Sequence, residues 1–259
     1  MTTTSLFCVS MAALHATTAC ADYTAAVLAD SPVAFWTFED VGGMTAADQS
    51  GNGRAGIYNR VSPWVSGARG TAGDFDGTTS FVDIGSNWGG GSAATIEAWV
   101  RITDPTGDIA AIVSAEQTQF VHFQFSAPAG TSDNVYYRTG QGITPGFPPP
   151  QLQSESQPTD GAWHHYVLTY DNTSMRQYID GVEVDSVLHG GGVLSVAADM
   201  SIGRGFLGGR HLRGQIDEVA IYDYALPADR VRAHFNAIPA PSAAVVIGLA
   251  GCVTLRRRR

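Results

Sequence analysis

The sequence predicts an all-β domain built as a two-sheet antiparallel sandwich, or jelly roll. Between residues 22 and 236, short strand-like segments recur and are separated by turns rich in glycine, which accounts for 30 of the 259 residues. Residues 22–236 contain one convincing helical pattern, close to their C-terminal end. Many short strands joined by turns are typical of sandwiches and jelly rolls, so we expect a single domain with one core.

Alternation and turn signals define the expected elements in order. In residues 95–102, every second side chain is apolar and would face the core. Asp180-Gly181 predicts a type I′ hairpin turn. The helix begins at Pro227, with Val231 and Phe235 as its docking stripe, and a short helix is expected over 23–29. The predicted strands are 33–38, 55–61, 73–76, 80–84, 95–102, 109–115, 120–125, 134–138, 163–170, 175–180, 182–186, 200–203 and 214–223.

An ordered set of motifs carries a family resemblance. It runs from SPVAFWTFED through FDGTTSFVDIG, TIEAWVRI, GAWHHYVLTYD and QYIDGVEV to GQIDEVAIYDYALPADRVRAHF. Taken together, these segments resemble LamG-like jelly-roll domains of the concanavalin A-like lectin/glucanase superfamily, over residues 22 to 235. The resemblance implies two stacked, curved antiparallel sheets of about six or seven strands each.

Asp217 is the first candidate site residue. Alternation along 214–223 places it on the same face as Val219 and Ile221, where an uncompensated buried carboxylate would cost several kcal/mol. One interpretation is a structural Ca²⁺. The resemblance implies such an ion between the first and last strands, and the predicted ligands are Asp217, Asp48, Asn52 and Glu39. The alternative is that backbone amides of the Asp48 loop compensate Asp217 without a metal.

The sequence does not indicate catalysis. Hydrolytic relatives need two carboxylates about 5–10 Å apart, and the matching strand offers only Glu97. His164 and His165 are adjacent on a strand and face opposite ways, so they cannot hold one ion together. His234 is predicted to be isolated. We therefore predict a protein that is not an enzyme, with a glycoside hydrolase as the less favoured alternative.

Aromatic side chains in loops are the candidate ligand contacts. Jelly-roll binders stack such rings on sugars, and the loops here offer Trp64, Trp88 and Phe147. Trp36, Trp99 and Trp163 lie in strands and are expected to pack in the core. The formal net charge of −9 argues against nucleic acid as a partner and leaves carbohydrate or the extracellular matrix as the expected one.

Residues 1–21 are interpreted as a secretory signal peptide. An apolar stretch at 6–14 is followed by Ala19-Cys20-Ala21, which fits an A-x-A cleavage site, although no Lys or Arg precedes it. Cys20 raises the alternative of a lipoprotein, but the usual leucine before it is missing.

Residues 237–259 resemble a PEP-CTERM sorting signal. Pro239-Ala240-Pro241 precedes an apolar run at 243–255 and four terminal arginines, with Ala240 in place of the glutamate. The apolar run reaches only about 20 Å as a helix, which is short for a bilayer core of about 30 Å. The resemblance implies an exosortase-type membrane protease as partner and transient inner-membrane contact. An ordinary membrane helix is the alternative.

Removal of residues 1–21 and 237–259 would leave a domain without cysteine, because Cys8, Cys20 and Cys252 all lie in these two segments. The sequence thus predicts a secreted or cell-surface binding domain over 22–236 that recognises carbohydrate without cleaving it. The alternative is a structural or adhesive protein that binds other proteins.

Overall fold

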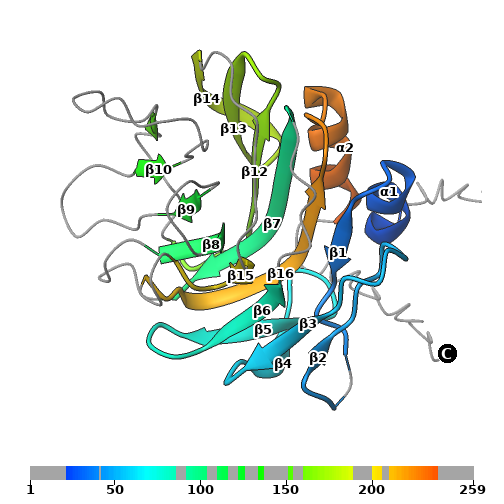
Figure 1. Ribbon diagram of the computed structural model, residues 1–259, viewed down its shortest axis with the longest axis vertical. Helices are drawn as coiled ribbons and strands as arrows, with labels where there is room; N and C mark the ends of the chain where they lie inside the picture. The colour runs from blue at the N-terminus through cyan, green and yellow to red at the C-terminus, as the bar shows by residue number, and fades with distance from the viewer. Residues whose placement is uncertain are drawn as a thin grey trace, which may run out of the picture.

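The computed structural model describes residues 22–40, 42–85, 92–103, 110–115, 122–125, 134–136, 151–153, 160–188, 200–205 and 210–238. Within these ranges the chain forms two antiparallel sheets of eight strands each, with helices α1 (Tyr23–Ala29) and α2 (Ala228–Ala237) at one side. Figure 1 shows the two sheets stacked as a sandwich, with both helices beside β1 and β16. The predicted sandwich is confirmed.

Sheet A carries the strands that position the candidate sites. Its order is β14-β13-β12-β7-β16-β5-β4, and β1 also pairs with β16. The bounds are β1 (Ala34–Trp36), β4 (Ser62–Ser66), β5 (Thr71–Asp76), β7 (Ala94–Ile102), β12 (His164–Tyr170), β13 (Ser174–Ile179), β14 (Val182–Leu188) and β16 (Arg213–Tyr222).

Sheet B lies across the core, in the order β11-β10-β9-β8-β15-β6-β3-β2. Its strands are β2 (Thr45–Ala46), β3 (Gly56–Asn59), β6 (Phe81–Gly85), β8 (Ala110–Ala115), β9 (His122–Phe125), β10 (Asn134–Tyr136), β11 (Gln151–Gln153) and β15 (Met200–Ile202). The sequence did not predict β2, β4 or β11. Two of these have only two or three residues, and β4 contains Pro63, which weakens a strand pattern.

Two apolar clusters stabilise the fold. The larger fills the space between the sheets, and β7 contributes its predicted face, Ile96, Ala98, Val100 and Ile102. The smaller joins the other face of sheet A to the helices and contains Trp99, Tyr178, Tyr222 and Val231. Trp36 and Trp99 are buried and Trp163 is partly buried, so the prediction that these three rings pack is confirmed. Sheet A is therefore covered on both faces over much of its area.

The turn between β13 and β14 forms as predicted. Asp180 and Gly181 both have positive φ, +50° and +75°, as a type I′ turn requires. A side chain at 181 would also meet Phe235 of α2, because its Cβ would lie 3.1 Å from the Cβ of Phe235.

Strand β16 contains a bulge that overturns one expectation. Its register with β7 shifts between Asp217 and Ala220, and Glu218 has a φ of +51°. Ile216 therefore lies in the same cluster as Val219 and Ile221, and the prediction that Asp217 shares their face is wrong. The extra residue at the bulge resets the alternation, so Asp217 reaches the Gly67–Thr71 turn instead.

The two helices pack against each other and on sheet A. Asp22 caps α1 by accepting a hydrogen bond from the Thr24 amide at 3.3 Å. In α2 the fully buried positions include Val231 and His234, whereas Phe235 is only partly buried. Ile238 still packs in the smaller cluster, two residues past the predicted domain end.

Among the residues that the structure describes, no helix is long and apolar enough to cross a membrane. The predicted signal peptide at 1–21, the Pro239-Ala240-Pro241 motif and the apolar run at 243–255 lie outside those residues.

Candidate functional site

Three carboxylates meet at the turn between β4 and β5, and we call Glu39, Asp217 and Glu218 the acidic cluster. One oxygen of Asp217 accepts a hydrogen bond from the Arg69 amide at 3.1 Å, and Glu39 accepts from the Thr71 amide at 2.9 Å. The turn fits closely around them. A Cβ at Gly67 would lie 2.5 Å from Asp217 Oδ2, and one at Gly70 would overlap the Glu39 carboxylate.

Arg69 is the cation that contacts the acidic cluster, since its Nη1 lies 3.2 Å from Glu218 Oε1. Asp217 and Glu218 are both fully buried, and Asp217 Oδ1 and Glu218 Oε2 have no hydrogen-bond partner. Burial raises the pKa of Asp217 well above its ordinary value, and the charge of Glu218 raises it further. Burial also raises the pKa of Glu218 to about 8, although Arg69 acts in the opposite direction.

The acidic cluster fits a cation in part. With all three carboxylates ionised, its negative charge would exceed that of its arginine, and two buried oxygens lack donors. However, no group of three or more His, Cys, Asp or Glu side chains in the described ranges is arranged to hold a metal. An ion here would need backbone carbonyls and water to complete its coordination, which Ca²⁺ accepts.

Asp48 and Asn52, the other two predicted ligands, are engaged within their own loop. Asp48 accepts hydrogen bonds from the amides of Phe35 at 3.0 Å, Ser50 at 2.9 Å and Arg54 at 2.9 Å. Asn52 donates to the carbonyls of Pro32 and Val33 at 3.2 and 3.0 Å. Of the four predicted ligands, the structure therefore brings Glu39 and Asp217 to one turn, while Asp48 and Asn52 fasten the 48–54 loop to β1.

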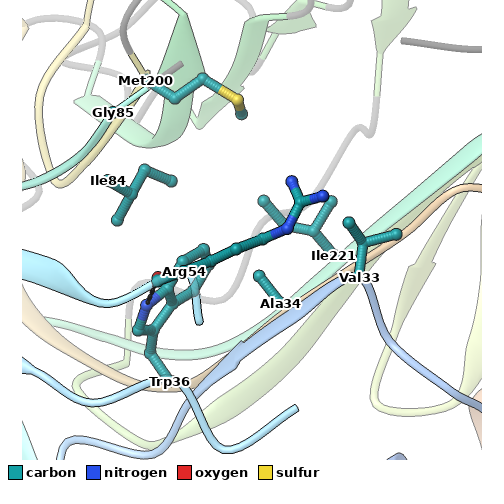
Figure 2. Close-up of a pocket in the computed structure, with 8 residues that line it drawn as sticks. All are labelled: Val33, Ala34, Trp36, Arg54, Ile84, Gly85, Met200 and Ile221. Carbon is teal, nitrogen blue, oxygen red and sulfur yellow. Dashed lines mark hydrogen bonds between the residues drawn. The ribbon is translucent and has the colours of Figure 1, made fainter. Parts of the chain in front are cut away.

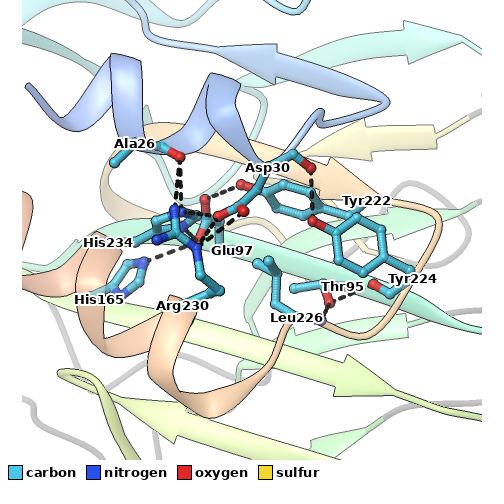
Figure 3. Close-up of polar contacts among 10 residues, drawn as sticks. All are labelled: Ala26, Asp30, Thr95, Glu97, His165, Tyr222, Tyr224, Leu226, Arg230 and His234. Atoms are coloured by element: carbon cyan, nitrogen blue, oxygen red, sulfur yellow. Dashed lines mark hydrogen bonds and ion pairs between the residues drawn. The ribbon is translucent and has the colours of Figure 1, made fainter.

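Glu97 lies at the centre of a second polar site on sheet A, beneath α1 and α2 (Figure 3). It accepts a hydrogen bond from Tyr222 Oη at 2.7 Å, and its other oxygen lies 3.0 Å from His234 Nδ1. His234 in turn reaches Asp30 at 2.8 Å, and Asp30 accepts from Arg230 at 2.8 Å. We call Glu97, His234, Asp30 and Arg230 the Glu97 network.

The charges in the Glu97 network balance. Burial alone would raise the pKa of Glu97, but the neighbouring His234 and His165 outweigh it and lower the pKa to about 2. Glu97 is 0% exposed, so no solvent-borne sugar touches it in this arrangement. The prediction that His234 is isolated is wrong, because its partners Glu97 and Asp30 lie far away in the sequence and no local pattern connects them.

The adjacent histidines point in opposite directions, as predicted. His165 is buried and stacks on Trp99 with ring centroids 5.2 Å apart. His164 faces outward, between Asp180 at 2.7 Å and Asp160 at 3.1 Å. It fastens the β13–β14 turn through Asp180, which also accepts from the His165 amide.

A small pocket is lined by residues from strands of both sheets (Figure 2). It encloses about 230 Å³, including its open mouth, and Figure 2 shows the Arg54 side chain extending toward Val33 and Ile221. Its other lining residues are Ala34, Trp36, Ile84, Gly85 and Met200. With one cation and an apolar wall, this pocket has no carboxylate that could act as an acid or base.

The predicted aromatic ligand contacts are not described by the structure. Trp88 and Phe147 lie outside the described residues, and for Trp64 the structure gives the strand β4 but not the side chain. Sequence reasoning missed Glu218, Arg69, Asp30 and His234. The one available signal for Glu218 was its position directly after Asp217. A regular strand cannot bury two successive acids on the same face, so this pair indicates an irregular strand.

Comparison with known proteins gives one family. The family described as "Concanavalin A-like lectin/glucanases superfamily" matches residues 76–232, more than half of the chain. No curated protein matches the chain.

Solved structures with the same fold include domain 4 of an extracellular arabinanase from Geobacillus stearothermophilus, in complex with arabinotriose. It has a TM-score of 0.62 and 19% identity, and the match covers 79% of this chain and 98% of that one. The binding domain of Paraclostridial Mosquitocidal Protein 1 gives 0.61 and 18%, over 80% and 52%. A Trypanosoma rangeli sialidase in complex with sialic acid gives 0.54 and 14%, over 78% and 32%. This chain thus spans about half of the mosquitocidal binding-domain chain and about a third of the sialidase chain.

Proposed function

Because the chain belongs to the concanavalin A-like lectin/glucanases superfamily, we propose that it is an exported carbohydrate-binding domain that does not cleave its ligand. An oligosaccharide is the ligand class that the family suggests. The arabinanase domain in complex with arabinotriose has the same fold over nearly its whole length, which supports this ligand class. The acidic surface also suits a neutral ligand better than nucleic acid.

The burial of Glu97 is the observation that carries the non-catalytic part of the proposal. This residue occupies the strand on which hydrolytic relatives carry their acids, and it lies under two helices with its charge matched by His234. Hydrolysis requires an acid and a second carboxylate on opposite sides of a sugar. A glycosidic oxygen would reach Glu97 only if α2 left the sheet, so the arrangement favours binding.

Export and sorting belong to the same proposal. The segment 1–21 would direct secretion, and 237–259 would be recognised by an exosortase-type protease after transient contact with the inner membrane. The mature protein would then act at the cell surface or in the extracellular matrix. Mass spectrometry of the termini tests this, and a full-length protein recovered from the cytosol would contradict it.

A structural Ca²⁺ in the acidic cluster is the second part of the proposal. Glu39 and Asp217 would hold the ion, which would supply the positive charge that Arg69 alone does not provide. The orphaned oxygens of Asp217 and Glu218 support this assignment. Since the ion would tie β16 to the β4–β5 turn, its role is to stabilise the fold and the loops that present the ligand surface.

A glycan array probed with the full chain tests the main proposal. We expect binding to a defined set of oligosaccharides, reduced by a calcium chelator and by Trp88→Ala. Leu188→Ala is the matched control, since it removes an apolar side chain that is 86% exposed on β14. Self-association without glycan binding would overturn the proposal in favour of an adhesive protein.

A further inference from the structure

His234 connects three elements of the domain through its two ring nitrogens. Its Nδ1 lies 3.0 Å from Glu97 Oε2 on β7, and its Nε2 lies 2.8 Å from Asp30 Oδ2 and 3.2 Å from the Ala26 carbonyl. Carboxylates and carbonyls only accept hydrogen bonds, so both nitrogens must donate. A neutral imidazole has one donor, and only the protonated ring has two. The geometry therefore requires a charged histidine.

The charges around the His234 ring also require that the histidine is protonated. With Glu97 and Asp30 ionised and Arg230 positive, a proton on His234 brings the formal charge of the Glu97 network to zero. Without it, one negative charge is left buried and a ring lone pair faces a carboxylate. The titratable and charged groups that face His234 or its partners are Glu97 on β7, Asp30 after α1, Tyr23 on α1, Tyr222 on β16, Tyr224 after β16, His165 on β12 and Arg230 on α2.

The helices held by this ring come from opposite ends of the domain. Asp30 and Ala26 belong to the first helical segment, and His234 lies in the last turn of α2. Together the helices cover the aromatic face of sheet A that includes Trp99, Tyr178 and Tyr222. A loss of the bonds to His234 would weaken the docking of α2 where it covers this face.

We propose that His234 is a pH-sensitive latch, which fastens α1 and α2 to sheet A when protonated and loosens α2 when the proton leaves. Burial acts to lower the pKa of His234, but Glu97 and Asp30 outweigh it and raise the pKa above its ordinary value. A histidine with a raised folded-state pKa contributes stability that is complete below the unfolded value, about 6.5, and is lost as pH rises through the folded value. The latch is therefore closed in mildly acidic solution and opens toward alkaline pH.

Hydrogen exchange of the full chain, read by mass spectrometry and corrected for the intrinsic rate at each pH, tests the latch. Between pH 6 and pH 9, the amides of α2 should lose about tenfold in protection, the equivalent of one charge-assisted hydrogen bond. His234→Gln should abolish this change. The matched control is His164→Gln, which removes another histidine held by two aspartates, on β12 and outside the Glu97 network. The control should keep the wild-type pH response.

Two further readouts keep the proposal falsifiable if His234→Gln does not fold. Glu97→Gln should move the loss of protection to lower pH, because it removes one of the charges that favour the proton. An NMR titration of the histidine rings should show one buried histidine doubly protonated at pH 6.5. Protection of α2 that is constant from pH 6 to pH 9, or a response that His164→Gln removes, would overturn the proposal.

Discussion

Two buried polar regions lie on the same face of sheet A, and they differ in charge balance. In the Glu97 network, two carboxylates face a protonated histidine and an arginine, and every charge has a partner. In the acidic cluster, three carboxylates face Arg69, and two buried oxygens have none. Buried charges persist in proteins only when they are compensated. The first region is thus complete within the fold, whereas Asp217 and Glu218, whose pKa values are raised by burial, need a proton or a bound cation to compensate them.

The largest loss of stability should come from substitutions of Glu97 in the Glu97 network. Glu97→Ala would leave protonated His234 buried without its strongest partner, at a cost of about 3–5 kcal/mol in the free energy of unfolding. Glu97→Gln should cost less, about 1–3 kcal/mol, because the amide still accepts from Tyr222. Urea unfolding followed by circular dichroism measures both. Equal losses in the two variants would mean that the lost charge, and not the hydrogen bond from Tyr222, accounts for the whole effect.

Calcium should stabilise the protein through the acidic cluster and not through the Glu97 network. At a concentration 100 times its Kd, the ion would add about 2.7 kcal/mol of stability, and the Tm would rise by roughly 5–10 °C. Asp217→Asn should abolish the rise. Asp48→Asn should lower the Tm but keep the rise, since Asp48 is bonded to its own loop. If instead Asp48→Asn removed the response, the ion would lie at the 48–54 loop.

Acid should remove the contribution of Glu97 to the free energy of unfolding within a defined pH window. The folded pKa of Glu97, about 2, lies below the ordinary value of about 4.3. A lowered carboxylate pKa contributes stability that is present above pH 4.3 and is lost as pH falls through 2. Other acids, including Asp76 and Asp171, also have lowered pKa values, so the difference between wild type and Glu97→Gln isolates this contribution. A difference that stays constant between pH 5 and pH 2 would contradict it.

The smallest effect is expected outside both regions. Asn52→Ala removes the hydrogen bonds that its side chain donates to the carbonyls of Pro32 and Val33. The loss should be about 1 kcal/mol, with no change in the calcium response. Differential scanning calorimetry with and without calcium checks both statements. A lost calcium response would restore Asn52 as a ligand.

The sequence predicted the sandwich well because alternation and turn residues are local signals. The face of β7 and the turn at Asp180-Gly181 needed nothing beyond their own segments. The bulge at Glu218 gave no such signal, because a non-glycine residue with positive φ is rare. Simple alternation therefore predicts the wrong face for Asp217.

The sites were harder to predict than the fold because their partners are distant in the chain. Asp217 was correctly identified as a carboxylate that needs compensation, and Glu39 does lie at the same turn. Arg69, however, meets Glu218 across 149 residues, and His234 meets Glu97 across 137. Neither contact can be inferred from the sequence before the arrangement of the strands and helices is known.

The central claim is that this domain holds a carbohydrate and leaves it intact. Incubation of the full chain with the oligosaccharides it retains on an array, followed by an assay for new reducing ends, tests that claim most directly. Retention with no new reducing ends is the predicted result. Turnover that Glu97→Gln abolishes would contradict it, since the glutamate would then have to leave its network with His234 to reach a sugar.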